Sequence, residues 1–491
     1  MLFPTAEFGL YFLLVFGIAW ALMDHLNARK VFLLAVSYLF YGWWDWRFLS
    51  LLCLSSAINY GVGLWLATHG HSTHKRTVVI AAVAANLAIL GFFKYFGFFA
   101  GSLADILESV GLARDVTLMH VILPIGISFF TFQGISYVLD VSRGDIDAVK
   151  NPVDLFLYIS FFPQLVAGPI VRAADFLPQL RERPALTQSA VTYGLVLISV
   201  GLFKKVVVAS YLATEIVDDV FAVPDAYSSL DLFFAAHAFV VQIYCDFSGY
   251  SDIAIGIAAL LGYRFRKNFD RPLAASSLQE LWQRWHISLT SWLRDYLYKP
   301  LKGRKRGNAI MYRNLVITMT VAGLWHGAAW TFVIWGALQG GMLIAERWLK
   351  GEVRQQTRAA DNAGIPLEDR PWPLWMAQVA GKTPMLGWVV TLNLFALTAV
   401  FFRAPDLATV GTFYLGLLQF TFTPEVFTPF VAVLITGAIA AQFLPASALR
   451  TTADRLIPMR PAALGVVFGI SLLAVEMIGP DGVAPFIYFQ F

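Results

Sequence analysis

The sequence predicts an all-α, polytopic membrane protein, and three observations lead to that prediction. Hydrophobic residues make up 58% of the 491 residues, and charged residues only 14%, compared with about 25% in a soluble domain. Many apolar runs are long enough to cross a bilayer as a helix. The runs are also continuous, which excludes the alternating pattern of a transmembrane β-barrel.

The apolar runs define the helices that we expect to cross the membrane, in a single integral-membrane domain covering residues 1–491. They predict about 10–11 transmembrane helices, with re-entrant and interfacial helices in addition. The first run has no basic n-region and no small-residue cleavage site, so we expect a retained helix. The expected spans lie near residues 8–23, 31–44, 48–67, 77–99, 120–139, 190–213, 230–262, 385–402, 427–444 and 462–479.

The distribution of lysine and arginine predicts the orientation of the chain. By the positive-inside rule, the basic region 264–313 lies on the cytoplasmic side, as do the loops 24–30, 68–76 and 446–461. Both chain ends, including the C-terminal tail of residues 480–491, are then extracytoplasmic. The basic residues of the region are Arg264, Arg266, Lys267, Arg271, Arg284, Arg294, Lys299, Lys302, Arg304, Lys305, Arg306 and Arg313.

The core of the expected fold, residues 156–346, begins with a segment that is interrupted by helix breakers. Residues 156–176 form an apolar run that contains Pro163, Gly168 and Pro169. Backbone that is not helical is tolerated at membrane depth only inside the protein or along a water-filled cavity. We therefore expect a broken or re-entrant element here, the alternative being a short kinked span.

The run 315–346 is longer than one span needs. If it crossed the membrane once, the later basic loop would fall on the wrong side. We therefore expect a hairpin that enters from the cytoplasm, bends near His326 and Gly327, and returns. His326 would then lie at its tip, deep in the membrane.

Two histidines in contrasting settings are the candidate catalytic residues. His326 lies in an apolar run, whereas His286 lies in an amphipathic segment rich in Trp and Arg. An ionisable group at membrane depth marks a functional site, unless it only packs helices through a backbone carbonyl. A neutral imidazole without a neighbouring Ser or Cys suits general-base work, in which it deprotonates a hydroxyl that attacks an acyl thioester.

Residues 276–298 interleave apolar and charged side chains, which predicts interfacial helices along the mouth of a cavity. We expect Arg284, Trp285, Asp295 and Trp325 to support this cavity or to bind the donor. The basic loop that follows could attract the phosphates of coenzyme A, or an acidic carrier protein with its phosphopantetheine arm.

The run 230–262 carries polar groups that also suit a cavity. Ser248 and Asp252 are four residues apart and share a helical face, whereas Asp246 points about 120° away from Asp252 on a regular helix. Gly249 could relax that geometry. The alternative is a polar seam between helices, without any chemistry.

Several motifs that would indicate other functions are missing from the sequence. We find no metal-ligand spacing, no phosphate-binding glycine loop and no nucleic-acid motif, and Cys53 and Cys245 suit small buried hydrophobes. A thioester donor needs no metal, so no permanently bound cofactor is expected. The expected partners are the cytoplasmic donor and membrane lipids, with no nucleic acid.

Five further motifs stand out in the sequence. They are FFPQLVAGPIVRAADFLPQL (161–180), QIYCDFSGYSDIAIGIAALLGY (242–263), LWQRWHISLTSWLRDYLYKPL (281–301), LWHGAAWTFVIWG (324–336) and FIYFQF (486–491). Together they resemble the membrane-bound O-acyltransferase family, in particular its bacterial branch that contains the alginate O-acetyltransferase membrane subunit and the D-alanyl transfer protein of teichoic acids.

The resemblance implies a bacterial inner-membrane enzyme that moves acetyl from a cytoplasmic thioester to an extracytoplasmic polysaccharide. It also implies a catalytic role for His326, a second family histidine at His286, and a thin central region reached by funnels from both sides. A separate extracytoplasmic acyltransferase is the implied partner. A different class remains open, a proton-coupled transporter or flippase of a glycan or lipid that uses His326, Asp246 and Asp252 as a relay.

The aromatic C-terminal tail allows two interpretations. It is a common kind of interfacial anchor. Pro480, Gly482 and Pro485 before it could instead let it reach back into the outer funnel. Tyr488 carries the only hydroxyl of the last six residues, and a nearby base could activate it to accept the acetyl group and relay it to the partner.

Overall fold

The computed structural model describes residues 3–112, 121–302, 307–362, 384–480, 482 and 486–487. Across these residues the chain is helical and has no strand, which confirms the all-α prediction. The helices are α1 (Ala6–Ala21), α2 (Leu26–Asp45), α3 (Leu49–Thr68), α4 (Lys75–Leu90), α5 (Phe96–Ser109), α6 (Ile127–Arg143), α7 (Pro152–Ser160), α8 (Phe162–Leu165), α9 (Ala173–Phe176), α10 (Gln188–Leu202), α11 (Ser210–Leu212), α12 (Asp218–Ala222), α13 (Ser229–Leu260), α14 (Leu278–Arg284), α15 (Ile287–Leu293), α16 (Lys299–Lys302), α17 (Asn308–His326), α18 (Trp330–Asn362), α20 (Pro384–Arg403), α21 (Leu407–Leu417), α22 (Pro429–Ala440), α23 (Ala448–Leu456) and α24 (Pro461–Ile478).

Six helical stretches of the described residues are long and apolar enough to cross a membrane, or seven if the bent pair of α22 and α23 counts as one span. The stretch Leu26–Thr68 joins two runs that the sequence separates, because only the short turn Trp46–Phe48 lies between α2 and α3. Other expected spans form shorter helices, such as α1 with 16 residues and α6 with 17. The protein is therefore a multi-pass membrane protein whose apolar helices differ widely in length.

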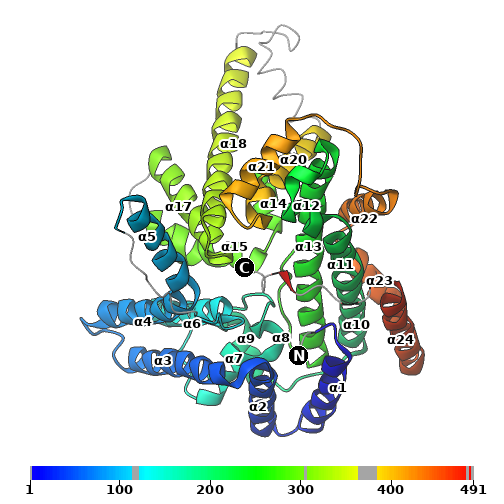
Figure 1. The fold of residues 1–491 in the computed structure, drawn as a ribbon. Coiled ribbons are helices and arrows are strands. Elements are labelled where there is room, and N and C mark those ends of the chain that lie inside the picture. The colour runs from blue at the N-terminus through cyan, green and yellow to red at the C-terminus, as the bar shows by residue number, and fades with distance from the viewer. Residues whose placement is uncertain are drawn as a thin grey trace.

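The longest buried helix is α13, which runs through the middle of the molecule (Figure 1). The helix α10 lies against it at backbone distance, because glycines face each other across the contact. A side chain added at Gly201 would meet the carbonyl oxygen of Gly249 at 2.6 Å, and the reverse holds at the same distance. Gly249 therefore permits close packing, and α13 remains a regular α-helix through it.

The interrupted segment that the sequence predicts within residues 156–176 is present and lies inside the protein. It consists of α7, a break at Phe161 and α8, and residues 157–171 are all buried. Backbone groups freed by the break are hydrogen-bonded: Phe162 N–H donates to Ser37 Oγ at 3.2 Å, and Tyr158 Oη–H donates to the Val171 carbonyl at 2.9 Å. Burial in protein with satisfied backbone groups is what such a break requires.

The hairpin expected over residues 315–346 is also present. The helix α17 ends at His326, and α18 begins at Trp330. The two helices approach closely because small residues line their contact, and a side chain at Gly340 would lie 2.9 Å from the Cα of Val316. The geometry places His326 at the tip of the hairpin, whereas entry from the cytoplasmic side stays a prediction.

Candidate active site

His326 is buried at the tip of the α17–α18 hairpin, with only 4% of its surface exposed. Aromatic rings surround the imidazole, and the ring centroids of Trp335 and Phe402 lie 5.6 and 5.1 Å from its own. The next residue, Gly327, must lack a side chain, because a Cβ there would overlap the ring of Phe332. Large aromatic side chains thus enclose His326, and the turn that follows it has room only for glycine.

His286 lies between α14 and α15 with φ of 42°, in the left-handed region that residues other than glycine rarely adopt. The Oδ1 atom of Asn268 accepts hydrogen bonds from the Ser288 backbone N–H at 3.1 Å and hydroxyl at 2.8 Å, which fixes its identity as oxygen. His286 Nδ1 lies 3.2 Å from the same oxygen and must donate to it. In the neutral ring, Nε2 therefore carries a lone pair.

The two histidines belong to one site, although 40 positions separate them in the sequence. Their ring centroids lie 6.5 Å apart. They line a common cavity of about 280 Å³, here called the histidine cavity. Its described lining residues are Gln279, Trp282, Gln283, His286, Leu289, Thr290, Leu293, Arg294, Tyr298, Leu315, Thr318, Met319, Ala322, His326, Leu343, Glu346 and Arg347.

A second, much narrower space adjoins His326. This apolar crevice, of about 10 Å³, has room for roughly one water molecule. Its lining residues are Phe239, Ile243, Trp285, His326, Trp335, Phe395, Ala399 and Phe402. Within the described part of the chain, His326 is the residue that lines both spaces.

Unused hydrogen-bonding groups surround the histidines. Among the described residues, no partner is found for the buried indole nitrogens of Trp282 and Trp335 or for Nε2 of His286. A buried indole N–H usually finds an acceptor. Trp282 lines the histidine cavity and Trp335 lines the crevice. The site therefore has two donors and one acceptor available for a ligand.

The end of α17 is held by two residues that sequence reasoning missed. Lys94 Nζ donates to the carbonyl oxygens of Trp325 and His326, the latter at 3.2 Å, and Tyr95 Oη–H donates to the Leu324 carbonyl at 2.9 Å. Both lie in a π-helical segment, Gly91–Tyr95. These carbonyls belong to the last turn of a helix, where a cation is favourable. A lysine inside the apolar run 77–99 was the available signal.

The acidic residues of α13 do not join the histidines. Asp246 pairs with Lys205 at 2.5 Å, and Asp252 pairs with Lys204 at 2.6 Å. Neither carboxylate is among the lining residues of the histidine cavity or the crevice. The structure therefore gives no support to a proton relay from these residues to His326.

The other expected support residues divide into two groups. Trp285 lines the crevice, and Trp325 contacts the rings of both histidines, with centroids 5.7 and 5.0 Å away. Ser248 and Arg284 are not among the lining residues of either space, and Arg284 instead pairs with Glu280 on its own helix.

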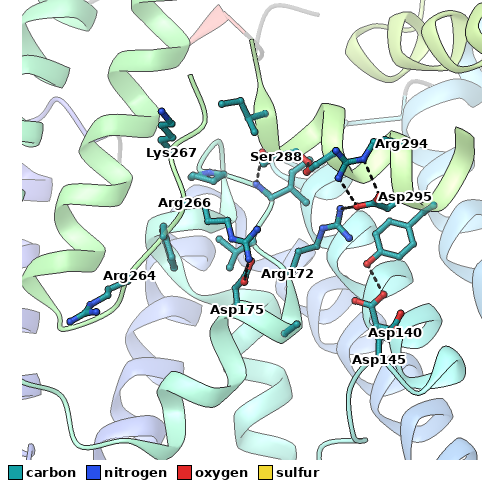
Figure 2. Close-up of a pocket in the computed structure, with 18 of the residues that line it drawn as sticks. Asp140, Asp145, Arg172, Asp175, Arg264, Arg266, Lys267, Ser288, Arg294 and Asp295 are labelled. Atoms are coloured by element: carbon teal, nitrogen blue, oxygen red, sulfur yellow. Dashed lines mark hydrogen bonds and ion pairs between the residues drawn. The ribbon is translucent and has the colours of Figure 1, made fainter. Parts of the chain in front are cut away.

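Asp295 lies at a separate charged cavity of about 570 Å³ (Figure 2). Figure 2 shows Arg172 and Arg294 turned toward this carboxylate, and Lys299 lies 2.8 Å from it. Partial burial acts to raise the pKa of Asp295, but bonds from Arg294 and Lys299 outweigh it and lower the pKa to about 2. The carboxylate therefore stays ionised at physiological pH. The cavity's charged residues are Asp140, Arg143, Asp145, Arg172, Asp175, Arg264, Arg266, Lys267, Arg294, Asp295 and Lys299.

Part of the C-terminal tail lies inside the protein rather than at an interface. Phe486 and Ile487 are buried, and the ring of Phe486 lies 5.9 Å from that of Phe247, which is itself 4.6 Å from the ring of His286. Tyr488 lies outside the described residues, as do residues 303–306 of the basic loop.

A buried histidine at the tip of a hairpin, which lines two spaces in a multi-pass helical protein, suits transfer of a group between two molecules that reach it within the membrane. A family model described as MBOAT, the membrane-bound O-acyltransferase family, matches residues 146–364. A probable alginate O-acetylase, AlgI, of Azotobacter vinelandii is 40% identical, over 80% of this chain and 73% of the relative. The chain belongs to the membrane-bound O-acyltransferase family, and the family expectation from its motifs is confirmed.

Further relatives agree on the class of enzyme. A probable alginate O-acetylase, AlgI, of Pseudomonas aeruginosa is 38% identical, over 86% of this chain and 75% of the relative. A peptidoglycan O-acetyltransferase of Helicobacter pylori is 34% identical, over 77% of this chain and 71% of the relative. The protein is therefore an acyltransferase, and of the two classes that the sequence left open, an enzyme and a transporter or flippase, the enzyme is correct.

Proposed function

We propose that the protein is a transmembrane O-acetyltransferase of a bacterial cytoplasmic membrane. It takes acetyl from a cytoplasmic thioester and delivers it outside for acetylation of a polysaccharide. The observation that carries the proposal is the position of His326 between the histidine cavity and the apolar crevice. We assign the histidine cavity to the donor, because it shares Arg294 with the charged cavity, and the crevice to the acceptor.

In the proposed reaction, the neutral imidazole of His326 removes the proton of an acceptor hydroxyl, and the oxygen bonds to the thioester carbonyl carbon. The tetrahedral intermediate collapses, the carbon–sulfur bond breaks, and the proton passes from His326 to the leaving thiolate. The indole N–H groups of Trp282 and Trp335 are available to stabilise the oxyanion.

His286 is proposed to position the donor. Its Nε2 lone pair, fixed by the bond from Nδ1–H to Asn268, suits acceptance of a hydrogen bond from an amide N–H. A pantetheine arm carries two such amides beside its thioester. The imidazole thus supports the chemistry without taking part in the proton transfer.

The donor is proposed to be acetyl-coenzyme A or an acyl group on a phosphopantetheine carrier protein. Both carry phosphate, and the charged cavity has seven Lys and Arg residues against four Asp. Arg294 lines both this cavity and the histidine cavity. Phosphates held beside Arg294 would leave the thioester arm directed toward the histidines.

The acceptor class is drawn from the relatives, which are named for alginate and peptidoglycan. We propose that an alginate-like exopolysaccharide or a related polymer is acetylated by a separate extracytoplasmic acyltransferase, with Tyr488 as the relay. The entry of Phe486 and Ile487 into the interior supports that route. Tyr488→Phe keeps the aromatic ring and removes the hydroxyl, so polymer acetylation should collapse while the protein still inserts.

The overall proposal is tested by deleting the gene and measuring the acetyl content of each surface polymer. We expect one polymer to lose its acetyl groups, and the wild-type gene, but not His326→Ala, to restore them. Purified protein in liposomes should also consume acetyl-coenzyme A when the acceptor system is supplied. Unchanged acetyl content in every polymer would reject the proposal.

A further inference from the structure

The tail passes a buried ion pair that neither the histidine cavity nor the crevice includes. Lys205 belongs to the π-helical segment Phe203–Ala209, and Asp246 lies on α13. Their side chains are 3% and 4% exposed, and the two charged groups lie 2.5 Å apart. The second carboxylate oxygen of Asp246 accepts a hydrogen bond from the backbone N–H of Ile487 at 2.8 Å.

The ion pair is poorly explained by stability alone. Burying two charges costs several kcal/mol, and apolar side chains of the same size often stabilise a fold as well or better. A buried backbone N–H without an acceptor, by contrast, costs about 1–3 kcal/mol. Ile487 is 1% exposed, so its backbone N–H depends on Asp246 as a hydrogen-bond acceptor. A hydrogen bond to an ionised acceptor is about twice as strong as one to a neutral acceptor.

Side-chain contacts hold the tail at the same place. The ring of Phe486 lies 4.8 Å from that of Tyr250 and 5.9 Å from that of Phe247, both on α13. Phe486 and Ile487 belong to different hydrophobic clusters, so the tail lies where the two meet.

The C-terminal end of α24 contacts the segment that carries Lys205 and the helix that follows it. Tyr211 Oη–H donates to the Ile478 carbonyl at 2.9 Å, and a side chain at Gly479 would meet Val206 at 2.9 Å. The chain thus leaves α24 beside the segment that carries Lys205.

We propose that the Lys205–Asp246 pair is an internal docking site for the C-terminal tail, which it holds next to the histidine pair. Phe247 connects the two, because its ring contacts both Phe486 and His286. Docking would position the chain end for acyl transfer, and this part rests on the proposed function. Lys205 and Asp246 are positioning residues, since they act through the tail.

The test is trimming of the purified protein from its C-terminus by carboxypeptidase, followed by intact mass. Single charge removal would leave an unpaired buried ion and risk misfolding, so two double variants are compared. Lys205→Met with Asp246→Asn keeps an oxygen acceptor, whereas Lys205→Met with Asp246→Leu removes it. We expect removal of Ile487 to be at least tenfold faster in the Leu variant than in the Asn variant.

The neighbouring pair supplies a matched control. Lys204 and Asp252 join the same two elements at 2.6 Å. Lys204→Met with Asp252→Leu removes that pair without touching the described tail contacts, so trimming at the wild-type rate is expected. If the folded Lys205→Met, Asp246→Leu variant were trimmed at the same rate as the wild type, the docking site would be overturned.

Activity is measured separately, so that docking and relay fail independently. If docking positions the tail, polymer acetylation should fall at least tenfold in the Lys205→Met, Asp246→Leu variant. Tyr488→Phe should leave the tail protected from carboxypeptidase. A fully active Tyr488→Phe protein would reject the relay, whereas the docking site would still be judged by the trimming experiment. A Leu variant with a freely trimmed tail and full acetylation would overturn the positioning role.

Discussion

At the scale of single residues, His326 and His286 share a cavity but differ in their neighbours. The Nδ1–H of His286 is committed to Asn268, whereas His326 lies between the cavity and the crevice. His326→Ala is expected to abolish acetylation, because loss of a general base costs about 100- to 10,000-fold. Acetyl content in cells and the amount of inserted protein are the measurements. Wild-type acetylation in a normally inserted variant would make His326 structural.

His286→Ala is expected to impair transfer less than His326→Ala, by roughly tenfold, since its role is one hydrogen bond to the donor. Steady-state kinetics with acetyl-coenzyme A should show the loss mainly in KM. Asn268→Ala removes the oxygen that fixes the tautomer, and it should reproduce part of the effect with the imidazole still in place. A complete loss in His286→Ala with normal donor binding would place His286 in the chemical step.

At the scale of elements, the position of His326 depends on the C-terminal end of α17, which Lys94 and Tyr95 hold. Lys94→Met keeps the aliphatic stem and removes the ammonium from the last carbonyls. Hydrogen bonds from a charged donor contribute about 1.5–3 kcal/mol. We therefore expect kcat to fall about tenfold or more, with an unchanged KM for the donor.

Two further variants separate positioning from general stability. Lys94→Arg restores a cation and should recover part of kcat, whereas Tyr95→Phe removes one neutral bond, to the Leu324 carbonyl, and should cost less. Lower yields of folded protein with wild-type kinetic constants would assign Lys94 a purely structural role.

The elements show what the sequence could and could not predict. The break at Phe161 and the hairpin at His326 were predictable, because Pro, Gly and run length act locally on the backbone. The partners of Asp246 and Asp252 were not. Helical periodicity identifies a shared face, but it does not reveal that consecutive lysines of a π-helical segment pair with both carboxylates.

The same limit applies to the site. His326 was identified from an ionisable group in an apolar run, which needs no partner to be recognised. Its neighbours Trp335 and Phe402, and the contact between the two histidines, depend on how α17, α18, α20 and the link between α14 and α15 pack against one another. Lys94 was overlooked because a single lysine near a span end is commonly explained by its reach to the interface.

At the scale of the whole molecule, basic residues line the charged cavity (Figure 2). This cavity shares Arg294 with the histidine cavity, so its cations can do more than set the topology. Several of its cations are already paired with Asp175 or Asp295. Arg143 and Arg264 are exposed and line the same cavity, so they are the residues to alter. Reversing both, with Arg143→Glu and Arg264→Glu, changes the field without breaking the Asp295 cluster.

The last expectation distinguishes attraction of phosphate from a general loss of fold. Acetyl-coenzyme A carries phosphates, whereas S-acetyl-pantetheine has the same thioester arm without them. The double reversal should raise KM for acetyl-coenzyme A about tenfold and weaken its dependence on salt, since steering by a charged surface is screened by ions. KM for S-acetyl-pantetheine should not change. Arg76→Glu, an exposed reversal at the start of α4 and away from the cavity, is the matched control and should leave both donors unaffected. If both donors suffer equally, or if acetyl-coenzyme A keeps its wild-type KM, the charged cavity does not bind the phosphates, and its cations serve packing and topology alone.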